Sequence, residues 1–239
     1  MNRVLSVARR EFRAFFSSPI AYVVLGVFLL VSGYLFFSTL FLQGQASLRN
    51  YFSLAPVLFV VFIPALTMRL LAEERKAGTL ELLLTFPVRD GEVVTGKFLA
   101  ALGMVAVGLA CTLPYPVTLS LLTAGNGTFD WGTALAGYVG FLFLASAFIA
   151  LGLWTSAASK NQIVAFIFGL LACFALYIVD KFAPLFPERI AGVLQYISVD
   201  YHFDNIARGV IDTRDVLFYA TLTALGLLFA TRTLAAVRQ

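Results

Sequence analysis

Six runs without a charged residue constrain the fold of this chain more than any other feature. They cover residues 20–42, 51–68, 98–129, 131–159, 161–179 and 216–231. A transmembrane helix needs about 20 apolar residues, and a charge at the bilayer centre costs about 2.5–3.5 kcal/mol, so charged residues mark where spans end. Only 13% of the residues are charged, about half the share in a soluble domain. The sequence therefore predicts an all-α integral membrane protein with six transmembrane helices in a single domain, residues 1–239.

The expected spans follow from these runs and lie at about residues 20–42, 51–71, 98–123, 132–155, 162–180 and 215–235. The last apolar run is short, but the side chain of Arg232 can reach the interface and lengthen that span. The first run is too long for the apolar region of a signal peptide, so we expect a retained span. Cys111 and Cys173 lie inside apolar runs and indicate no disulfide framework.

The distribution of lysine and arginine predicts the orientation of the spans. With both termini in the cytoplasm, twelve of these residues lie inside and five outside. The outer set is Arg49, Lys181, Arg189, Arg208 and Arg214. Cytoplasmic loops carry the excess of positive charge, so we expect cytoplasmic termini. The basic residues are scattered between apolar runs, a pattern that does not favour nucleic acid as a partner.

The first 18 residues have the pattern of an amphipathic helix. Apolar residues recur at helical spacing and form one face: Leu5, Ala8, Phe12, Phe15 and Phe16. The opposite face carries arginines and a serine: Arg3, Ser6, Arg9, Arg10 and Arg13. Such a helix lies in the membrane interface, with its arginines near the lipid headgroups. We expect an interface helix over residues 1–18, in contact with membrane lipid, that ends before Pro19.

The predicted cytoplasmic loop, residues 72–97, contains a second short helix. Gly78 interrupts the chain, Thr79 can cap a new helix, and Glu81 lies in its first turn, where the helix dipole favours an acid. Pro87 ends this helix, and Asp90 is expected to cap the third span. A short helix that is both apolar and charged, held at the membrane surface, suits docking to a partner.

The external segment, residues 181–214, is too long for a simple turn. Two apolar stripes at helical spacing predict two short amphipathic helices over the outer mouth: Ile190, Val193, Leu194 and Ile197, then Phe203, Ile206, Ala207 and Val210. Asp212 to Asp215 has the pattern of a capped start for the sixth span.

No segment carries the pattern of a catalytic site. Residues 91–97 match G-x-x-x-x-G-K, but Phe98 stands where a phosphate-binding loop needs serine or threonine, and no apolar strand precedes the motif. His202 is the only histidine, so a zinc site would lack partners and no metal is expected. The spans carry no charge near the membrane midplane of the kind that ion-coupled carriers use. This suggests that the energy for any movement through the spans is supplied by another protein.

Two further patterns concern the shape and packing of the spans. Pro114 and Pro116 predict a kink in the third span. Ser146/Ala150 and Gly152/Ser156 are small-residue pairs of the kind that let helices pack closely.

The loop also carries a pattern of residues found in a known family. From Glu74 to Pro87 the sequence reads E-x-x-x-G-T-x-E-x-L-L-x-x-P, and Gly96-Lys97 follows before the third span. This resembles the signature of ABC-2-type ABC transporter permeases. Residues 202–215, with Arg10-Glu11-Phe12 and Ser18-Pro19-Ile20, are similar to the subgroup that includes the gliding-motility-associated and nitrous-oxide-reductase maturation permeases.

The resemblance implies one subunit of an ATP-driven transporter in the cytoplasmic (inner) membrane, with export as the expected direction. Two permease chains would form a homodimer above two separate ABC ATPase subunits, which would bind ATP and Mg; this chain would bind no cofactor and catalyse no reaction itself. By the same resemblance, the coupling region is formed by Glu73, Glu74, Arg75, Gly78, Thr79, Glu81, Leu83 and Pro87. Ser159 and Lys160 would make a second cytoplasmic contact, and Arg9, Arg10, Phe12 and Arg13 belong to the interface helix.

The sequence leaves alternatives open both for the external helices and for the whole chain. The external helices either gate the exit, with His202, Phe203, Asp204, Arg208 and Asp212 as candidates, or bind an extracytoplasmic accessory protein, or simply pack as a lid. The whole chain could instead be a membrane scaffold without transport, or a carrier that needs no ATPase. The lack of buried charge along the spans favours a lipid, lipid-linked or amphipathic substrate over a small ion.

Overall fold

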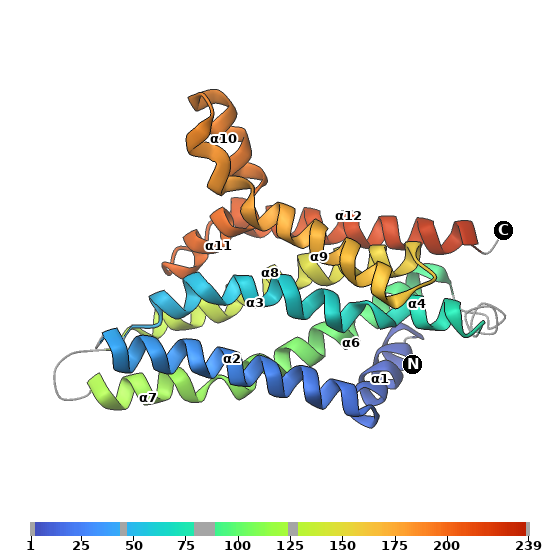
Figure 1. Cartoon of the computed structure of the whole chain (residues 1–239), viewed down its shortest axis with the longest axis horizontal. Helices are drawn as coiled ribbons and strands as arrows, with labels where there is room; N and C mark the ends of the chain where they lie inside the picture. The colour runs from blue at the N-terminus through green and yellow to red at the C-terminus, as the bar shows by residue number, and fades with distance from the viewer. Residues whose placement is uncertain (1–2, 44–46, 79–88, 124–128, 238–239) are drawn as a thin grey trace.

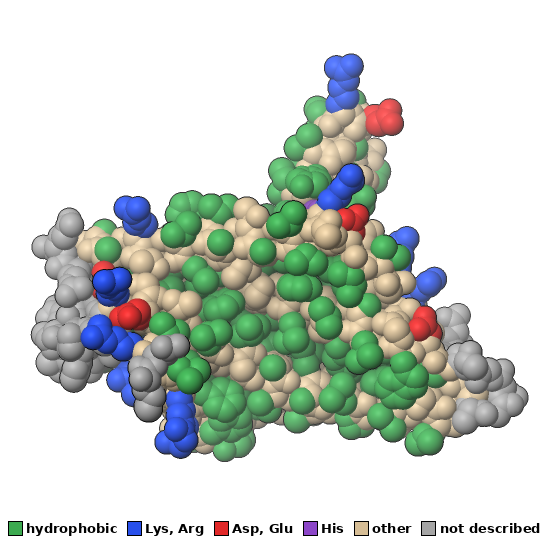
Figure 2. Space-filling model, turned by 180° about the vertical axis from the view of Figure 1, so that it is seen from behind, with side chains coloured by type: hydrophobic (Ala, Val, Ile, Leu, Met, Phe, Trp, Pro, Cys, Tyr) green, Lys and Arg blue, Asp and Glu red, His purple; other side chains and the backbone are tan. Residues whose placement is uncertain are grey.

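The computed structural model describes residues 3–43, 47–78, 89–123 and 129–237, and every regular element in these ranges is helical. Six helical segments are long and apolar enough to cross a membrane: Ala21–Phe41, Arg49–Lys76, Asp90–Thr123, Trp131–Ala158, Gln162–Leu185 and Thr213–Ala236. The predicted fold class, an all-α membrane protein with six spans, is confirmed. Figure 2 shows hydrophobic side chains over the sides of the bundle and charged side chains toward its ends.

The elements follow one another in a simple order. The interface helix α1 (Arg3–Ser17) precedes the first span α2 (Pro19–Gln43), and the second span is α3 (Arg49–Thr67) continued by α4 (Arg69–Lys76). The third span is α6 (Asp90–Cys111) with α7 (Pro114–Thr123), the fourth is α8 (Trp131–Ala158), and the fifth is α9 (Gln162–Ile178) with the 3₁₀ helix η1 (Val179–Leu185). The short helices α10 (Glu188–Ile197) and α11 (Val199–Ala207) precede the sixth span α12 (Thr213–Val237).

The bundle has two distinct ends. Both ends of the chain lie at one of them, together with α1 and α4, and α7 and α11 lie at the other (Figure 1). We call these the termini end and the opposite end.

The fourth span, α8, forms the centre of the bundle. Phe141, Leu144 and Phe148 of this helix have no exposed surface, and α8 packs against α3, α6, α9, α11 and α12. The spans α2, α9 and α12 are the least buried, so their apolar side chains face outward. A helix that is apolar on all sides belongs in the core, as α8 does, or in lipid.

The predicted kink in the third span is a break between α6 and α7. Pro114 and Pro116 have no N–H group, so the helix cannot pass through them with its hydrogen bonds intact. Tyr138 of α8 donates its hydroxyl proton to the carbonyl of Thr112 over 2.9 Å. A polar group that a break leaves unpaired within a membrane must find another partner, and Tyr138 supplies it.

Two local expectations were wrong. Asp90 does not cap the third span, because the helix begins at Asp90 itself and Arg89 takes the capping position, where its N–H donates to Glu92 Oε2 over 2.8 Å. The two outer helices do not both lie over the mouth. The helix α11 packs on the bundle, but α10 has no buried residue and projects away from it (Figure 1), because η1 directs the chain outward.

Candidate functional site

The interface helix α1 lies along α6 at the termini end. Gly96 permits this close contact, since a Cβ at that position would lie 2.6 Å from Val7 Cγ1. Five residues further along α1, Phe12 lies against Gly103 of α6, where an added Cβ would be 3.2 Å from the phenyl ring. The predicted interface-helix arginines Arg9 and Arg13 are exposed on the other side. The apolar residues Ala8 and Phe12 thus lie on the covered side of α1, whereas Leu5, which the pattern assigned to the same face, is exposed.

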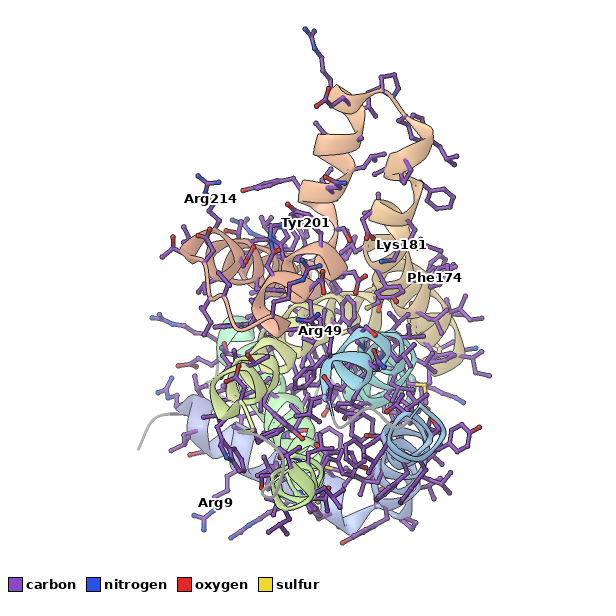
Figure 3. The ribbon with its side chains drawn as sticks, turned by 90° about the vertical axis from the view of Figure 1, so that its left-hand side faces the viewer. Arg9, Arg49, Phe174, Lys181, Tyr201 and Arg214 are labelled. Carbon is purple, nitrogen blue, oxygen red and sulfur yellow. The ribbon has the colours of Figure 1, made fainter. Side chains whose placement is uncertain are left out.

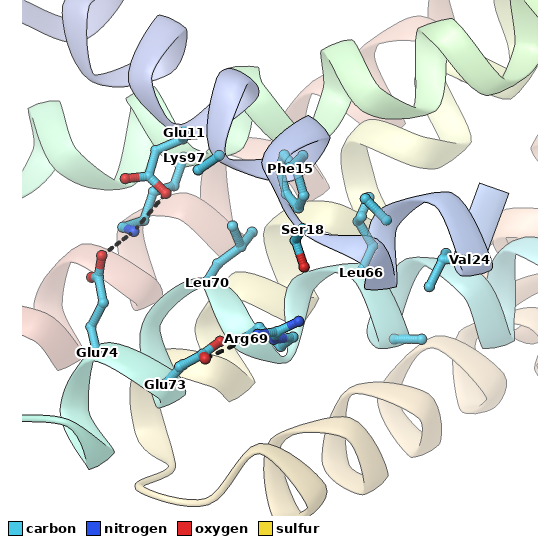
Figure 4. Close-up of a pocket in the computed structure, with 13 residues that line it drawn as sticks. Glu11, Phe15, Ser18, Val24, Leu66, Arg69, Leu70, Glu73, Glu74 and Lys97 are labelled. Atoms are coloured by element: carbon cyan, nitrogen blue, oxygen red, sulfur yellow. Dashed lines mark hydrogen bonds and ion pairs between the residues drawn. The ribbon is translucent and has the colours of Figure 1, made fainter.

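A buried lysine joins α1, α4 and α6. Lys97 of α6 is 1% exposed, and its Nζ lies 2.7 Å from Glu74 Oε1 of α4 and 3.1 Å from Glu11 Oε2 of α1. The Glu11 carboxylate also receives a hydrogen bond from Arg10 over 3.0 Å. Removing one member of a buried ion pair leaves the remaining charge without compensation, so the three helices depend on one another here. Figure 4 shows Lys97 between the two glutamates.

The helix α4 is fixed to α8 by a serine. Ser156 Oγ donates to the carbonyl of Met68, where α3 gives way to α4, over 3.0 Å. The same oxygen accepts hydrogen bonds from the backbone N–H groups of Leu71 and Ala72, each over 3.1 Å. These N–H groups belong to the first turn of α4, which has no partner within its own helix. Ser156 therefore serves as a cap supplied by another span.

The charged coupling residues that the structure describes, Glu73, Glu74 and Arg75, have partners within the chain. Glu73 receives two hydrogen bonds from Arg69, over 2.7 and 3.0 Å, and Arg75 donates to the carbonyl of Ala157 at the end of α8. Gly78 has φ of +68°, a conformation that glycine adopts readily, and it follows α4. Thr79, Glu81, Leu83 and Pro87, the other predicted coupling residues, lie outside the described residues.

The second predicted contact lies beside the first. Ser159 and Lys160 form the turn between α8 and α9, and Lys160 is exposed. The hydrogen bond from Arg75 to Ala157 brings this turn next to α4. The two segments that the sequence assigned to cytoplasmic contacts are therefore neighbours at the termini end.

The segment that matches a phosphate-binding motif is helical. Residues 91–97 form the first turns of α6, and Lys97 is engaged by two glutamates. A phosphate-binding loop needs an open turn of backbone N–H groups and a lysine directed at the phosphates. The residues present here do not fit ATP.

The opposite end contains a buried histidine, His202. The sequence analysis named it as a candidate gate residue but did not predict its partners. His202 Nδ1 lies 2.6 Å from Asp215 Oδ1, and Nε2 lies 3.0 Å from the carbonyl of Tyr196. Each ring nitrogen therefore faces an oxygen atom of a different helix, Asp215 of α12 and Tyr196 of α10. His202 also stacks on Phe218, with 4.0 Å between ring centroids. The histidine thus fastens α10 and α11 to the start of α12.

Three of the four other candidate gate residues lie around one cavity. Phe203 is buried and stacks on Phe141 of α8, with 4.9 Å between centroids. Asp204 and Arg208 form an exposed ion pair on α11. Asp212 accepts a hydrogen bond from the N–H of Arg214 over 2.9 Å at the start of α12, which lowers the pKa of its carboxyl. Phe203, Asp204 and Arg208 line the same polar cavity, whereas His202 and Asp212 are not among its lining residues.

A polar cavity of about 260 Å³ lies at this end. Figure 3 looks onto it, with Arg49, Lys181 and Tyr201 around it. Lys181 Nζ lies 2.6 Å from Asp200 Oδ2 and 3.1 Å from Asp180 Oδ2, so it ties η1 to α11. Burial raises the pKa of the Asp200 carboxyl, and the charge of Lys181 opposes that rise. Within the described ranges, no cluster of three His, Cys, Asp or Glu residues could hold a metal ion.

Sequence reasoning missed the residues that connect the helices. Lys97 was interpreted as the marker of a span end, Ser156 as a small packing residue, and Glu11 only as part of a resemblance. Their partners are 23 to 88 residues away along the chain. Lys97 stands directly before a long apolar run, which could have indicated a lysine near the bundle interior. That local pattern did not identify its two glutamate partners.

A family model matches most of the chain. Residues 5–202 fit the model of the family described as ABC-2 family transporter protein. No curated protein matches the chain.

Proposed function

Since the chain belongs to the ABC-2 family of transporter proteins, we propose that it is the membrane-spanning subunit of an ATP-driven exporter whose ATPase is a separate protein. The family and the six spans make it a multi-pass membrane permease of an ABC transporter. The ATPase, the direction of transport and the copy number are the parts that we propose. The likeness of residues 202–215 to the gliding-motility and nitrous-oxide-reductase maturation permeases supports that subgroup.

The junction of α1, α4 and α6 is the observation that carries the proposal. A force applied to α4 reaches α1 and α6 through Glu74 and Lys97, and it reaches α8 through Ser156 and Arg75. Interfaces of this kind shift as units because packed elements are not continuously deformable. An ATPase that binds α4 and the turn at Lys160 would therefore move several spans together.

The charge distribution supports a cytoplasmic termini end. The helices α1 and α4 and the start of α6 carry eight of the 17 lysine and arginine residues, and five lie toward the opposite end. The excess of these residues faces the cytoplasm in membrane proteins. We infer that both termini, α4 and Lys160 face the ATPase, and that α10 and α11 are extracytoplasmic, where α10 could contact an accessory protein.

The exposed apolar surfaces of three spans support a second copy of the chain as partner. The small-residue pairs of α8 face inward: a Cβ at Gly152 would lie 2.1 Å from Thr67 Oγ1, and Ser156 binds α4. Contact between two chains would therefore involve α2, α9 or α12, whose apolar side chains are exposed. We propose a homodimer, with ATP and Mg bound by two ATPase subunits.

Co-purification from the native cells tests the proposal. A tagged chain in mild detergent should bring down a P-loop ATPase, identified by mass spectrometry. Lys76→Glu and Lys160→Glu reverse exposed charges at the termini end and should release the ATPase. Arg189→Glu reverses an exposed charge on α10 and should retain it.

Two results would contradict the proposal. Absence of any ATPase would favour a carrier that needs none. Binding of an ATPase without ATP-dependent substrate movement in reconstituted vesicles would favour a scaffold.

A further inference from the structure

Two cavities meet between the first two spans near the termini end. The first, of about 270 Å³, lies among α1, α2, α3 and α4 and has charged residues at one side (Figure 4). The second, of about 40 Å³, is lined by apolar residues of α2, α3 and α6. Val24 and Leu66 line both cavities, so the two adjoin at these side chains, and we refer to them together as the groove.

The combined groove is polar at the end of the bundle and apolar toward its middle. Along α2, the lining advances from Ala21 to Phe28, about 10 Å at 1.5 Å per residue. The polar part contains Arg69 and Glu73, at the level where α4 leaves the span. A ligand that fills this groove has a polar head and an apolar tail that points into the membrane.

The charged residues in the polar part of the groove determine which headgroup can bind there. Three carboxylates, Glu11, Glu73 and Glu74, face two cations, Arg69 and Lys97. Pockets that bind anionic lipids are basic, and this one is not. A head that carries both signs matches it, because the carboxylates accept N–H groups and Arg69 can donate to a phosphate. Arg69 uses Nε and Nη2 for Glu73, and its Nη1 makes no hydrogen bond to a described residue.

We propose that this groove binds a phospholipid whose headgroup is a primary ammonium, such as phosphatidylethanolamine, from the leaflet at the termini end. Its phosphate lies at Arg69, its ammonium among the carboxylates, and one acyl chain in the apolar part beside Phe28. The site sits where α1 meets α4, so an occupied groove supports the junction that the proposed coupling uses. Binding itself needs no ATPase.

Native mass spectrometry of the full chain in detergent tests this proposal. The delipidated chain is titrated with phosphatidylethanolamine, its N,N-dimethyl analogue, phosphatidylcholine and phosphatidylglycerol, all with the same acyl chains. Because each N-methyl group removes a hydrogen-bond donor, the first three lipids should bind in that descending order. Phosphatidylethanolamine should bind roughly tenfold more tightly than phosphatidylcholine, the effect of one hydrogen bond to a charged group.

Matched variants locate the site. Ala65→Phe fills the larger cavity and should abolish the preference, whereas Ala175→Phe adds the same ring on the exposed side of α9 and should leave it unchanged. Glu73→Gln should reduce binding of phosphatidylethanolamine but not of phosphatidylcholine. Its control is Asp204→Asn, which alters a second ion pair of the i, i+4 type, at the opposite end of the bundle.

Several results would overturn the proposal. Equal binding of phosphatidylglycerol or phosphatidylcholine would contradict the headgroup assignment. An unchanged lipid preference in Ala65→Phe, or in Val24→Phe if the first variant fails to fold, would contradict the location. If Ala65→Phe abolished dimer formation but left lipid binding unchanged, a second copy of the chain, and not a lipid, would occupy the groove. Because the test uses the chain alone, its failure leaves the proposed ATPase coupling standing.

Discussion

The two ends of the bundle each bury a charged group, but they use it differently. At the termini end, Lys97 pairs with Glu11 and Glu74, which are 86 and 23 residues away and belong to two other helices. At the opposite end, Asp215 pairs with His202, 13 residues away in the adjoining helix. There α11 is held mainly by apolar side chains, Val199, Phe203 and Ile206. The comparison teaches that charge joins distant segments at one end, whereas apolar packing fixes a local cap at the other.

The largest effect should come from apolar packing at the opposite end. Phe203→Ala removes a ring that is 1% exposed and stacked on Phe141. Loss of a buried phenylalanine costs about 3–5 kcal/mol of unfolding free energy. Unfolding in SDS mixtures should show this loss, with the more exposed Tyr201→Ala as the control. An equal loss for both variants would break the comparison.

The next effect should come from the buried lysine. Lys97→Met keeps the length of the side chain but leaves Glu11 and Glu74 close together without a cation, which costs about 3 kcal/mol. Adding Glu11→Gln and Glu74→Gln removes the repulsion and should restore most of the stability. The same unfolding experiment measures both variants. Failure of the triple variant to recover would show that Lys97 acts through packing rather than charge.

A smaller effect should follow from loss of the serine that caps α4. Ser156→Ala removes the partner of two backbone N–H groups, and leaving buried donors unpaired costs about 1–3 kcal/mol. Hydrogen exchange should rise at Leu71 and Ala72. Ser120→Ala is the control, because Ser120 donates only to Val117 of its own helix among described residues.

The smallest effect should come from an exposed cap. The side-chain and backbone hydrogen bonds from Thr133 lower the pKa of the Asp130 carboxyl at the start of α8. A carboxyl with a lowered pKa stabilises the folded state above its unfolded pKa, about 3.9, and this contribution disappears as the pH falls through the folded value. Thermal unfolding of the wild type should therefore lose slightly more stability below about pH 4 than Asp130→Asn does. A parallel loss in both would contradict the role of this cap.

The sequence allowed the spans to be predicted, but not the contacts between them. The spans are encoded locally, since a charge such as Asp130 or Lys160 interrupts an apolar run wherever the membrane ends. The partners of Lys97 and Ser156 depend on which helices meet in three dimensions, and no local pattern encodes that. The helix α6 begins at Asp90, within one residue of the start that the predicted cap implied, although the apolar run begins only at residue 98. Lys97 interrupts that run, but its charge is compensated inside the bundle.

Photo-crosslinking in living cells tests the central claim, that a separate ATPase drives this permease through α4. A photoreactive amino acid replaces Lys76 on α4, and in a second strain it replaces Arg189 on α10; both positions are exposed. The account predicts a crosslink from position 76 to a P-loop ATPase and none to that ATPase from position 189. A crosslink to an ATPase from position 189 alone, or none from position 76, would contradict it.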